Sequence, residues 1–461
     1  MIMRLLPLAP VLLVAACGTT PLVELPSRSD PFPMDLPAMR TFSGAPTPEQ
    51  FNQSNASLAY DFLELSFQME SGRELEVFSR FEGPVTLALT TSVTPVFSAD
   101  LDALLGRFQR EAKLPIRRIN DPETANILIE TLPRQKLRQL VPHAACFVVP
   151  RVSSWQEFRK NRRSGALDWT TLEQREKVTI FIPDDVSPQE ARDCLHEEIA
   201  QALGPLNDIY RLPQSTFNDD NIHTILTSFD MLILRITYDE SLKSGMTKAE
   251  VAKRLPAILR RLNPSGGDGT PITGPSISRA WVRQIETALA PRGSQAKRTI
   301  AARRAVQIAR QENWNDNRLG FSLLALGRMA LGSDGPTAPQ SFAEAFAVYS
   351  ALYGADDIHT SHAALQLAAF NLSRGEADET LAIINTAIPS VRRAENAALL
   401  ATLLMLKAEA LDHLGRVQEA ATVRLDSLGW ARYGFGSDAE IRGRLREISR
   451  LRPRKKGAEL G

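Results

Sequence analysis

The first half of the chain alternates short apolar runs with segments of helical spacing. Five runs rich in β-branched and apolar residues predict strands, and they occupy residues 85–91, 115–119, 125–132, 145–150 and 177–183. After the first run, apolar side chains recur at helical intervals over residues 99–111, at Leu101, Leu104, Leu105 and Phe108. Another amphipathic segment, NASLAYDFLELSFQME, begins at Asn55. The pattern predicts an α+β domain whose order is strand, helix, four strands and helix.

The last helix of that series is marked at both ends. Ser187 suits the N-cap, Pro188 suits the first helical position, and Glu190 is the third residue after the cap. Gly204, followed by a proline, ends the pattern. We expect Gly204 to take the left-handed conformation that often closes a helix. The predicted helix therefore contains the sequence CLHEEIAQAL, residues 194–203.

A glycine-rich segment, SGGDGTPITGP at residues 265–275, separates this domain from a nearly all-helical region. Glycines punctuate that region about 40 residues apart, at Gly332, Gly375 and Gly415. The unit LKAEALDHLGRVQEAATVRLDSLGWA, residues 406–431, resembles a degenerate tetratricopeptide repeat. The resemblance implies helical hairpins that stack into a solenoid. A generic helical bundle is the alternative.

Composition excludes several classes of function. The 461 residues are enough for two or three domains. Hydrophobic residues make up 43% of the chain. The net charge is +1, so the chain has no strong electrostatic field that would attract an acidic partner. The sequence contains neither a phosphate-binding G-x-x-x-x-G-K loop nor a G-x-G-x-x-G dinucleotide motif. We therefore expect no nucleic-acid partner.

The N-terminus resembles a bacterial lipoprotein signal. Residues 1–16, MIMRLLPLAPVLLVAA, hold one Arg, a short apolar run and small residues, and are too short to span a bilayer. The box VAAC ends at Cys17, and the resemblance implies that Cys17 becomes the first residue, carries lipid and anchors the chain. Gly18 follows in place of an Asp, which favours the outer membrane and a periplasmic location. A plain secreted protein with a chance cysteine is the alternative.

Removal of Cys17 from the count leaves Cys146 and Cys194. An oxidising periplasm favours a disulfide between them, and two buried free thiols are the alternative. The predicted divisions of the chain are a signal peptide, a lipidated Cys with a flexible tether, an α+β domain, a linker, a helical domain and a basic tail. Their boundaries are 1–16, 17–54, 55–262, 263–276, 277–450 and 451–461.

The helix over residues 188–203 has a polar arc. At about 100° per residue, Glu197, Glu198 and Gln201 share this arc with Cys194. The adjoining arc faces the core and carries Leu195, Ile199, Ala202 and Leu203. His196 lies outside the polar arc, so the pair His196 and Glu197 is not in the register of an H-E-x-x-H zinc motif.

Shifted by one residue, this helix resembles the active helix of the metzincin zinc proteases, whose spacing is H-E-x-x-H-x-x-G-x-x-H. Glu197, Gln201 and Asn207 stand where that family has its three ligand histidines. Glu198 stands where it has the general base. The order of strands and helices also resembles the metzincin upper domain, and Met231 could supply the Met below the metal. The resemblance covers about residues 55–260.

The replaced histidines change the chemistry. Glu197, Gln201 and Asn207 offer oxygen ligands, which suit calcium, magnesium or manganese better than zinc. Such a metal lowers the pKa of a bound water little, so Glu198 would have no activated nucleophile. We therefore expect no cofactor, and a divalent metal belongs to the alternative interpretation.

The histidines outside this helix offer few further ligands. His223 and the acids of FNDDNIH, residues 217–223, could return ligands to a groove, although a helix cap is the simpler use. His143 is expected to be structural or exposed. The remaining three are expected at solvated helical positions: His359, His362 and His413.

Residues 55–260 also resemble a family of uncharacterised proteobacterial lipoproteins, a domain of unknown function. The stretches that carry the resemblance are RFEGPV (80–85), CLHEEIAQALGPLNDIYRLPQSTFNDDNIHTILTSFDMLILR (194–235) and LKSGMTKAEVAKRLPAIL (242–259). It implies a domain type and brings no activity with it.

The sequence thus predicts a lipid-anchored envelope protein with two working parts. A degenerate metzincin-like domain would bind a peptide or protein in a groove without cleaving it. The helical repeats would bind a protein partner. The alternative is an atypical metal-dependent hydrolase with Glu198 as general base.

Overall fold

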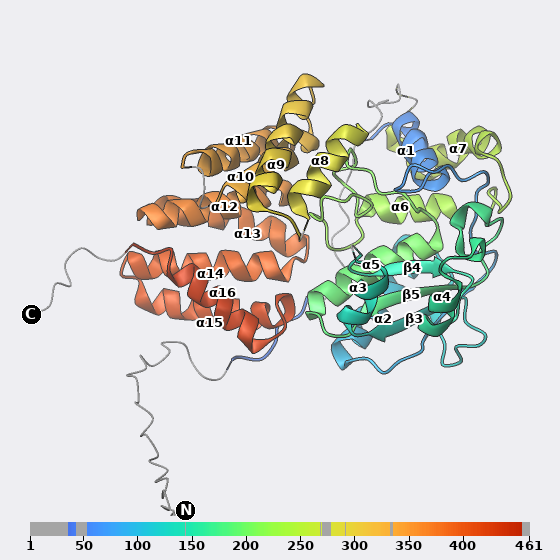
Figure 1. Cartoon of the computed structure of the whole chain (residues 1–461), viewed down its shortest axis with the longest axis horizontal. Helices are drawn as coiled ribbons and strands as arrows, with labels where there is room; N and C mark the ends of the chain where they lie inside the picture. The colour runs from blue at the N-terminus through green and yellow to red at the C-terminus, as the bar shows by residue number, and fades with distance from the viewer. Residues whose placement is uncertain are drawn as a thin grey trace, which may run out of the picture. The chain divides into compact units, whose positions relative to one another are not determined.

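The computed structural model describes residues 36–42, 53–142, 144–267, 269, 278–290, 292–331 and 335–453 (Figure 1). The predicted signal peptide, Cys17, His143, most of the linker and most of the basic tail lie outside the described residues. By the density of their contacts, residues Pro37–Gly461 form one compact unit. That unit consists of an α/β part followed by an all-helical region.

A five-stranded mixed sheet forms the centre of the α/β part. Its strand order is β2-β1-β3-β5-β4, and all neighbours are parallel except β4, which runs antiparallel to β5 at one edge. Each of the five apolar runs forms one strand, which confirms the strands predicted from the sequence. They are β1 (Val85–Leu89), β2 (Ile116–Arg118), β3 (Ile127–Leu132), β4 (Phe147–Pro150) and β5 (Val178–Pro183).

Helices surround this sheet (Figure 1). They are α1 (Asn55–Phe67), α2 (Pro95–Glu111), α3 (Arg134–Leu140), α4 (Trp155–Asn161), α5 (Pro188–Leu203), α6 (Ser228–Thr237) and α7 (Lys248–Leu262). Short 3-10 turns also occur, at Gly165–Leu167, Trp169–Thr171 and Pro264–Gly266. One main core joins α1, α2, α5, α6 and α7 to the strands, and Ile129, Ile180 and Ile199 are fully buried in it.

The start of α5 agrees with the sequence, and its end does not. The Ser187 side chain accepts a hydrogen bond from the backbone N–H of Glu190, as expected for an N-cap. Gly204, however, has φ −171° and is not left-handed, so that expectation is wrong. Glycine is required there by a close approach, because an added Cβ would lie 2.8 Å from Cγ2 of Thr237 on α6.

A buried arginine closes the C-terminal end of α5. The Arg175 guanidinium donates hydrogen bonds to the carbonyl oxygens of Gln201 (2.5 Å), Ala202 (2.7 Å) and Gly204 (2.5 Å). Its positive charge also opposes the negative end of the helix dipole. Burial lowers the pKa of Arg175 to about 10, so the side chain remains charged at neutral pH. Arg175 therefore holds the end of the helix that leads into the candidate site.

The second part contains only helices within the described residues. They are α8 (Arg279–Leu289), α9 (Gln295–Gln311), α10 (Asn317–Ala330), α11 (Thr337–Tyr353), α12 (Ile358–Arg374), α13 (Ala377–Arg393), α14 (Ala397–His413), α15 (Val417–Gly434) and α16 (Asp438–Ser449). Each helix from α8 to α15 contacts the next one along the chain. Small residues permit close pairs, since Gly320 and Gly327 of α10 face the rings of Tyr349 and Phe342 on α11.

Polar contacts join the two parts of this unit. Arg192 of α5 forms a buried ion pair with Glu395, between α13 and α14. The Tyr433 hydroxyl of α15 donates to Asp100 of α2 at 2.7 Å. Among the described helices, none is long and apolar enough to cross a membrane.

Candidate functional site

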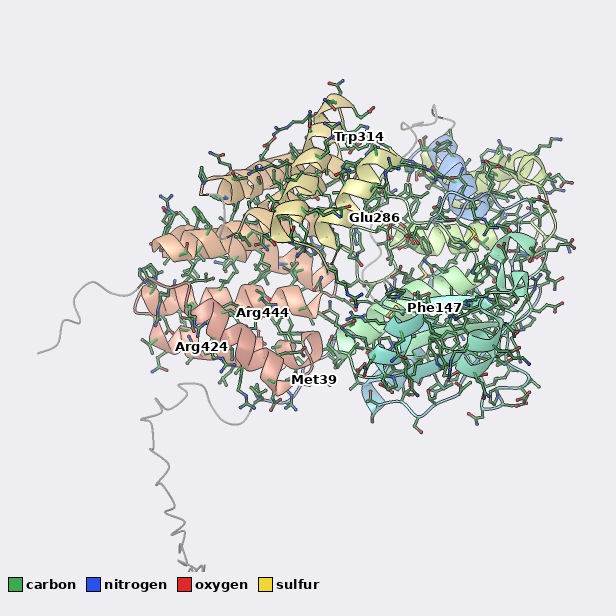
Figure 2. The ribbon with its side chains drawn as sticks, in the orientation of Figure 1. Met39, Phe147, Glu286, Trp314, Arg424 and Arg444 are labelled. Atoms are coloured by element: carbon green, nitrogen blue, oxygen red, sulfur yellow. A yellow bond between two sulfur atoms is a disulfide. The ribbon has the colours of Figure 1, made fainter. Side chains whose placement is uncertain are left out.

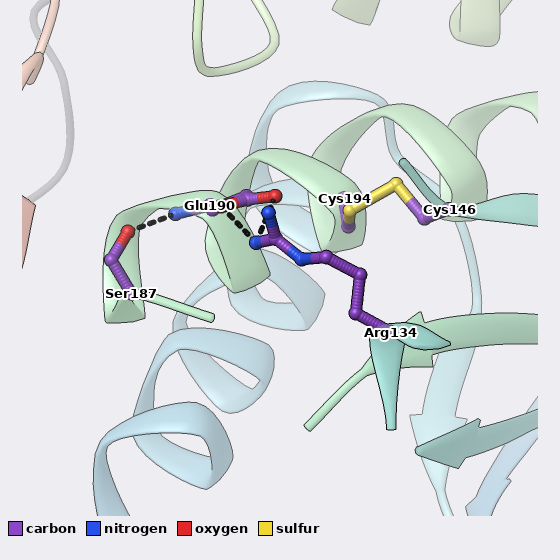
Figure 3. The surroundings of a disulfide bond; sticks show 5 residues. All are labelled: Arg134, Cys146, Ser187, Glu190 and Cys194. Carbon is purple, nitrogen blue, oxygen red and sulfur yellow. Dashed lines mark hydrogen bonds and ion pairs between the residues drawn. A yellow bond between two sulfur atoms is a disulfide. The ribbon is translucent and has the colours of Figure 1, made fainter. Parts of the chain in front are cut away.

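Helix α5 is tied to the edge strand of the sheet by a pair of cysteines. The Sγ atoms of Cys146, directly before β4, and Cys194 on α5 lie 2.09 Å apart, at disulfide distance, which confirms the predicted pairing (Figure 3). One turn earlier on α5, Glu190 accepts two hydrogen bonds of 2.7 Å from the guanidinium of Arg134, the first residue of α3. These links fix α5 along its length.

His196 has a structural role. Its side chain is only 2% exposed, and its Nδ1 accepts a hydrogen bond of 3.1 Å from the backbone N–H of Leu226. Burial, together with the charges of Arg192 and Arg107, lowers the pKa of His196 well below its usual value. The ring is therefore neutral, and its position agrees with the helical geometry that placed it outside the polar arc.

Two adjacent glutamates of α5 are held in a low-dielectric environment. Glu198 is 4% exposed, and its Oε2 has no hydrogen-bond partner among the described residues. Burial, with the charges of Asp208 and Glu70, raises the pKa of Glu198 to about 8. Burial and the charge of Glu198 likewise raise the pKa of Glu197 well above its usual value. The ionised forms of both carboxyl groups are therefore disfavoured.

The two amides of the metzincin-like spacing are engaged separately. The Gln201 side-chain N–H donates to Oδ2 of Asp208 at 3.3 Å. The Asn207 side-chain N–H donates to the backbone oxygen of Glu64 at 3.2 Å. No group of three or more His, Cys, Asp and Glu side chains within the described residues is arranged to hold a metal. The residues present at these positions therefore do not fit a catalytic zinc.

A cavity of about 750 Å³ opens directly after α5. Its wall comes from α1, the turn after α1, the loop after α5, the start of α7 and one face of α8. The lining residues are Tyr60, Leu63, Glu64, Gln68, Met69, Glu70, Ser71, Gly72, Asn207, Asp208, Tyr210, Asp219, Lys248, Arg279, Val282, Arg283 and Glu286. Of the four positions that carry the metzincin-like spacing, only Asn207 lines this cavity.

Acidic side chains gather in this cavity. Glu286, labelled on α8 in Figure 2, lines it together with Glu70, Asp208 and Asp219. Burial and the charges of Glu70 and Glu286 raise the pKa of Asp219 to about 7. Burial and the charges of Glu197 and Asp219 raise the pKa of Asp208 well above its usual value. The carboxyl groups therefore repel one another when ionised.

Among these cavity acids, the sequence indicated Asp219, which is one of the acids of the FNDDNIH segment. It did not indicate Asp208, although Asp208 directly follows Asn207 of the metzincin-like spacing. Glu70 and Glu286 come from distant parts of the chain. Only tertiary packing brings them together, and no local spacing would have indicated it.

One expectation about the histidines of the helical region is wrong, because His359 is buried. His359 is 3% exposed, and its Nδ1 lies 2.9 Å from Oδ1 of Asp357. The ring of His223 lies 5.5 Å from that of His359. Burial lowers the pKa of His223 to about 4 and that of His362 to about 3. His359 is thus a packed residue where the loop after α5 meets α12, and not a solvated one.

The FNDDNIH segment forms turns, and one of its acids, Asp219, lines the cavity. The side-chain Oδ1 of Asn218 accepts from the backbone N–H of Asp220, and the side-chain Oδ1 of Asp220 accepts from the backbone N–H of Ile222. Met231 lies in α6, 2% exposed and within the main core. Thr227 and Asp230 form a reciprocal cap at the start of α6.

Residues 55–257 match the protein family described as "Protein of unknown function (DUF2927)". The matched range begins at the first residue of α1 and ends inside α7, and the all-helical region follows it. No curated protein and no solved structure matches the chain.

Proposed function

We propose that this chain is a lipid-anchored protein of the bacterial cell envelope that binds a peptide or protein segment without cleaving it. The cavity of about 750 Å³ after α5 carries the proposal. A cavity of this size accepts a few residues of a peptide. It lies at the end of the helix that carries the metzincin-like spacing, where a related protease would hold its substrate.

The chemistry of the spaced residues supports binding without hydrolysis. Gln201 and Asn207 use their amide N–H groups on protein acceptors, and neither can supply the imidazole that zinc prefers. The five-stranded sheet followed by α5 agrees with a degenerate metzincin-like domain. On this proposal the domain keeps the groove of such a fold and has lost the metal chemistry.

The helical region supports a role in assembly. Helices α10, α12 and α14 begin at Asn317, Ile358 and Ala397, about 40 residues apart, which suits enlarged tetratricopeptide-like hairpins. The cavity is joined to this region, because Tyr210 on its floor meets the ring of Trp281 on α8 edge-on at 4.9 Å. We propose that the helices bind a protein partner while the cavity holds a peptide segment.

A binding assay with a cavity-filling variant tests the proposal. A library of short fluorescent peptides is titrated against soluble protein that lacks residues 1–17. Val282→Trp should block binding, because Val282 lines the cavity. Val186→Trp is the matched control, since Val186 lines a different cavity of about 820 Å³ between α5 and α16. Peptide binding that Val282→Trp leaves unchanged would place the site elsewhere.

Membrane attachment is tested separately. We expect Cys17→Ala to release the protein from the membrane fraction and to remove labelling by radioactive palmitate. A variant that stays in the membrane fraction and remains labelled contradicts lipidation at Cys17. The proposed outer-membrane location is checked by separating the two membranes on a density gradient.

One observation favours the second candidate function, an atypical hydrolase. Glu198 has a buried Oε2 without a partner among the described residues, and its pKa of about 8 suits a general acid or base near neutral pH. Glu197, Gln201 and Asn207 would then hold a hard divalent cation. Glu198→Gln should abolish any peptidase activity of purified protein supplied with manganese or calcium. Equal activity of the variant would exclude this role.

A further inference from the structure

The carboxyl groups in and behind the cavity lack the cations that accompany other buried acids of this chain. Asp61 and Glu64 both pair with Arg211. Glu395 pairs with Arg192. By contrast, no ion pair within the described residues involves the cluster made by Glu70, Glu197, Glu198, Asp208, Asp219 and Glu286. Burial of an unpaired carboxylate is costly, so this grouping needs an explanation.

Two buried oxygen atoms of this cluster are also without hydrogen bonds. They are Oδ1 of Asp208, which lines the cavity, and Oε2 of Glu198, whose pKa is raised in part by the charge of Asp208. Neither atom has a partner among the described residues. Buried polar atoms are nearly always satisfied in native proteins, by protein, water or ligand. A donor that enters the cavity would satisfy Asp208.

The rim of the cavity has the opposite charge. Lys248, Arg279 and Arg283 line it, and no ion pair involves Lys248 or Arg283 in the part of the chain that the structure describes. Arg279 donates a long hydrogen bond of 3.4 Å to the backbone oxygen of Ser71. These three cations disfavour a polycation at the entrance. They favour a ligand whose carbonyl or carboxylate groups remain at the rim.

We propose that the cavity takes one positively charged side chain of a bound peptide, an ammonium or guanidinium group, and places it between Asp208 and Asp219. This inference rests on the proposed peptide-binding function and names the class of residue that the site recognises. Tyr60, Leu63 and Met69 supply apolar surface for the aliphatic stem of such a side chain. A bare metal ion fits less well, because the described acids are not grouped at coordination distance.

The raised pKa of Asp219 predicts that binding of the cationic side chain depends on pH. Asp219, whose pKa is about 7, is partly protonated in the free protein at neutral pH. A cation between the carboxyl groups stabilises their ionised forms and so lowers their pKa. Binding therefore releases protons, and affinity rises as the pH is raised from about 6 to about 8.

Calorimetric titration with matched peptides tests the inference. Three capped peptides of equal length carry a central lysine, acetyl-lysine or glutamate among neutral residues, and each is titrated into soluble protein lacking residues 1–17. We expect the lysine peptide to bind at least about ten-fold more tightly than the acetyl-lysine peptide. Its apparent binding enthalpy should differ between phosphate and Tris buffers, because protons are released.

Variants then locate the contact. Asp208→Asn keeps the shape of the floor and should remove the preference for lysine, and Asp219→Asn serves as a second variant in case the first does not fold. Glu447→Gln, on the wall of the other cavity, should retain the preference. A preference that survives in both floor variants overturns the inference.

The outcomes separate this inference from the proposed function. Equal binding of the lysine and acetyl-lysine peptides, both blocked by Val282→Trp, overturns the inference and leaves peptide binding in place. Binding of neither peptide nor of any library member overturns both. If calcium or manganese alone binds stoichiometrically and displaces the lysine peptide, the acidic cluster is a metal site and the inference is overturned.

Discussion

At the scale of single residues, the candidate site depends on carboxyl groups whose protonation the fold controls. Glu198 is surrounded by apolar atoms and by Asp208, so its charged form is disfavoured and its neutral form is tolerated. Gln201 and Asn207 have the spacing of metal ligands but the hydrogen bonds of ordinary structural amides. Of the positions that serve catalysis in a zinc protease, Asn207 lines the cavity, whereas Glu197, Glu198 and Gln201 do not.

The raised pKa of Glu198 predicts how stability depends on pH. The ordinary pKa of a glutamate is 4.5, and in the folded protein it is about 8. The folded state therefore binds the proton more tightly, and the stability gained from it is complete below about pH 4 and is lost as the pH rises through about 8. Between these values, the free energy of unfolding should fall with rising pH.

Glu198→Gln should reduce that dependence, because glutamine resembles the protonated acid and cannot ionise. We expect the variant to exceed the wild type in stability by roughly 2 kcal/mol at about pH 9 and to be similar at about pH 5. Urea denaturation across this range measures the difference. Glu447→Gln, on the surface of α16, is the control. If the free energy of unfolding of Glu198→Gln falls with rising pH as steeply as that of the wild type, the prediction is wrong.

At the scale of secondary structure, the end of α5 is the element on which the site depends most. Arg175 is 2% exposed, and it donates to three backbone carbonyl groups at the C-terminal end of α5. Its guanidinium lies 5.0 Å from the ring centre of Trp169. Lysine in its place would keep the charge but lose the planar fork that reaches several acceptors at once.

Arg175→Lys should therefore destabilise the protein by about 3 kcal/mol, since buried carbonyl groups lose their donors. The midpoint of urea denaturation, followed by circular dichroism, measures the change. Arg254→Lys is the matched control, because the Arg254 guanidinium also donates to a helix carbonyl, that of Glu250, but at the surface. Equal midpoints for the two variants would show that Arg175 does not hold the helix end.

The bond between Cys146 and Cys194 predicts a second effect on α5. It links residues 48 positions apart and so restricts the unfolded chain. The double variant Cys146→Ser with Cys194→Ser should lose about 3 kcal/mol of stability. Dithiothreitol should lower the unfolding midpoint of the wild type and have no effect on the double variant. If dithiothreitol leaves the unfolding midpoint of the wild type unchanged, this prediction is wrong.

The elements that were predicted from the sequence are those whose burial leaves a recognisable pattern of apolar residues along the chain. Four of the five strands are apolar runs within the sheet, whereas β2 has two arginines, and α5 has its cap residues in the expected order. Helices α3 and α4 were not predicted, because each has seven residues and a single buried side chain, Leu137 or Phe158, which gives no periodicity. Glu70, Asp208 and Glu286 were missed for a different reason, since they belong to segments that are distant from one another in the sequence.

At the scale of the whole molecule, the α/β part and the helical region share buried polar contacts. The Gln189 side-chain N–H donates to Asn396 at 3.2 Å, and its oxygen accepts from the backbone N–H of Ala398 at 2.8 Å. Near the cavity, the Asn317 side-chain N–H donates to the backbone oxygen of Tyr210 at 2.5 Å. These contacts join the helical region to α5 and to the loop that follows it.

Substitution of Glu395 tests most directly whether the α/β part and the helical region stabilise each other. It has φ 51°, a left-handed conformation that costs a non-glycine residue about 1 kcal/mol, yet its carboxylate forms the buried ion pair with Arg192. Glu395→Ala keeps a side-chain carbon in that conformation and leaves the Arg192 charge buried without a partner. We expect a loss of about 3 kcal/mol, because an uncompensated buried charge is strongly destabilising.

Glu395→Gly separates the two contributions, since glycine removes the backbone strain and the ion pair together. It should be less destabilising than Glu395→Ala by about 1 kcal/mol. Glu419→Ala, which breaks the exposed ion pair with Arg416, should leave the unfolding midpoint unchanged. If Glu395→Ala unfolds like the wild type, the two parts do not stabilise each other through α5. If it unfolds in two separate transitions while the wild type shows one, the ion pair makes the chain fold as one cooperative unit, as the shared contacts require.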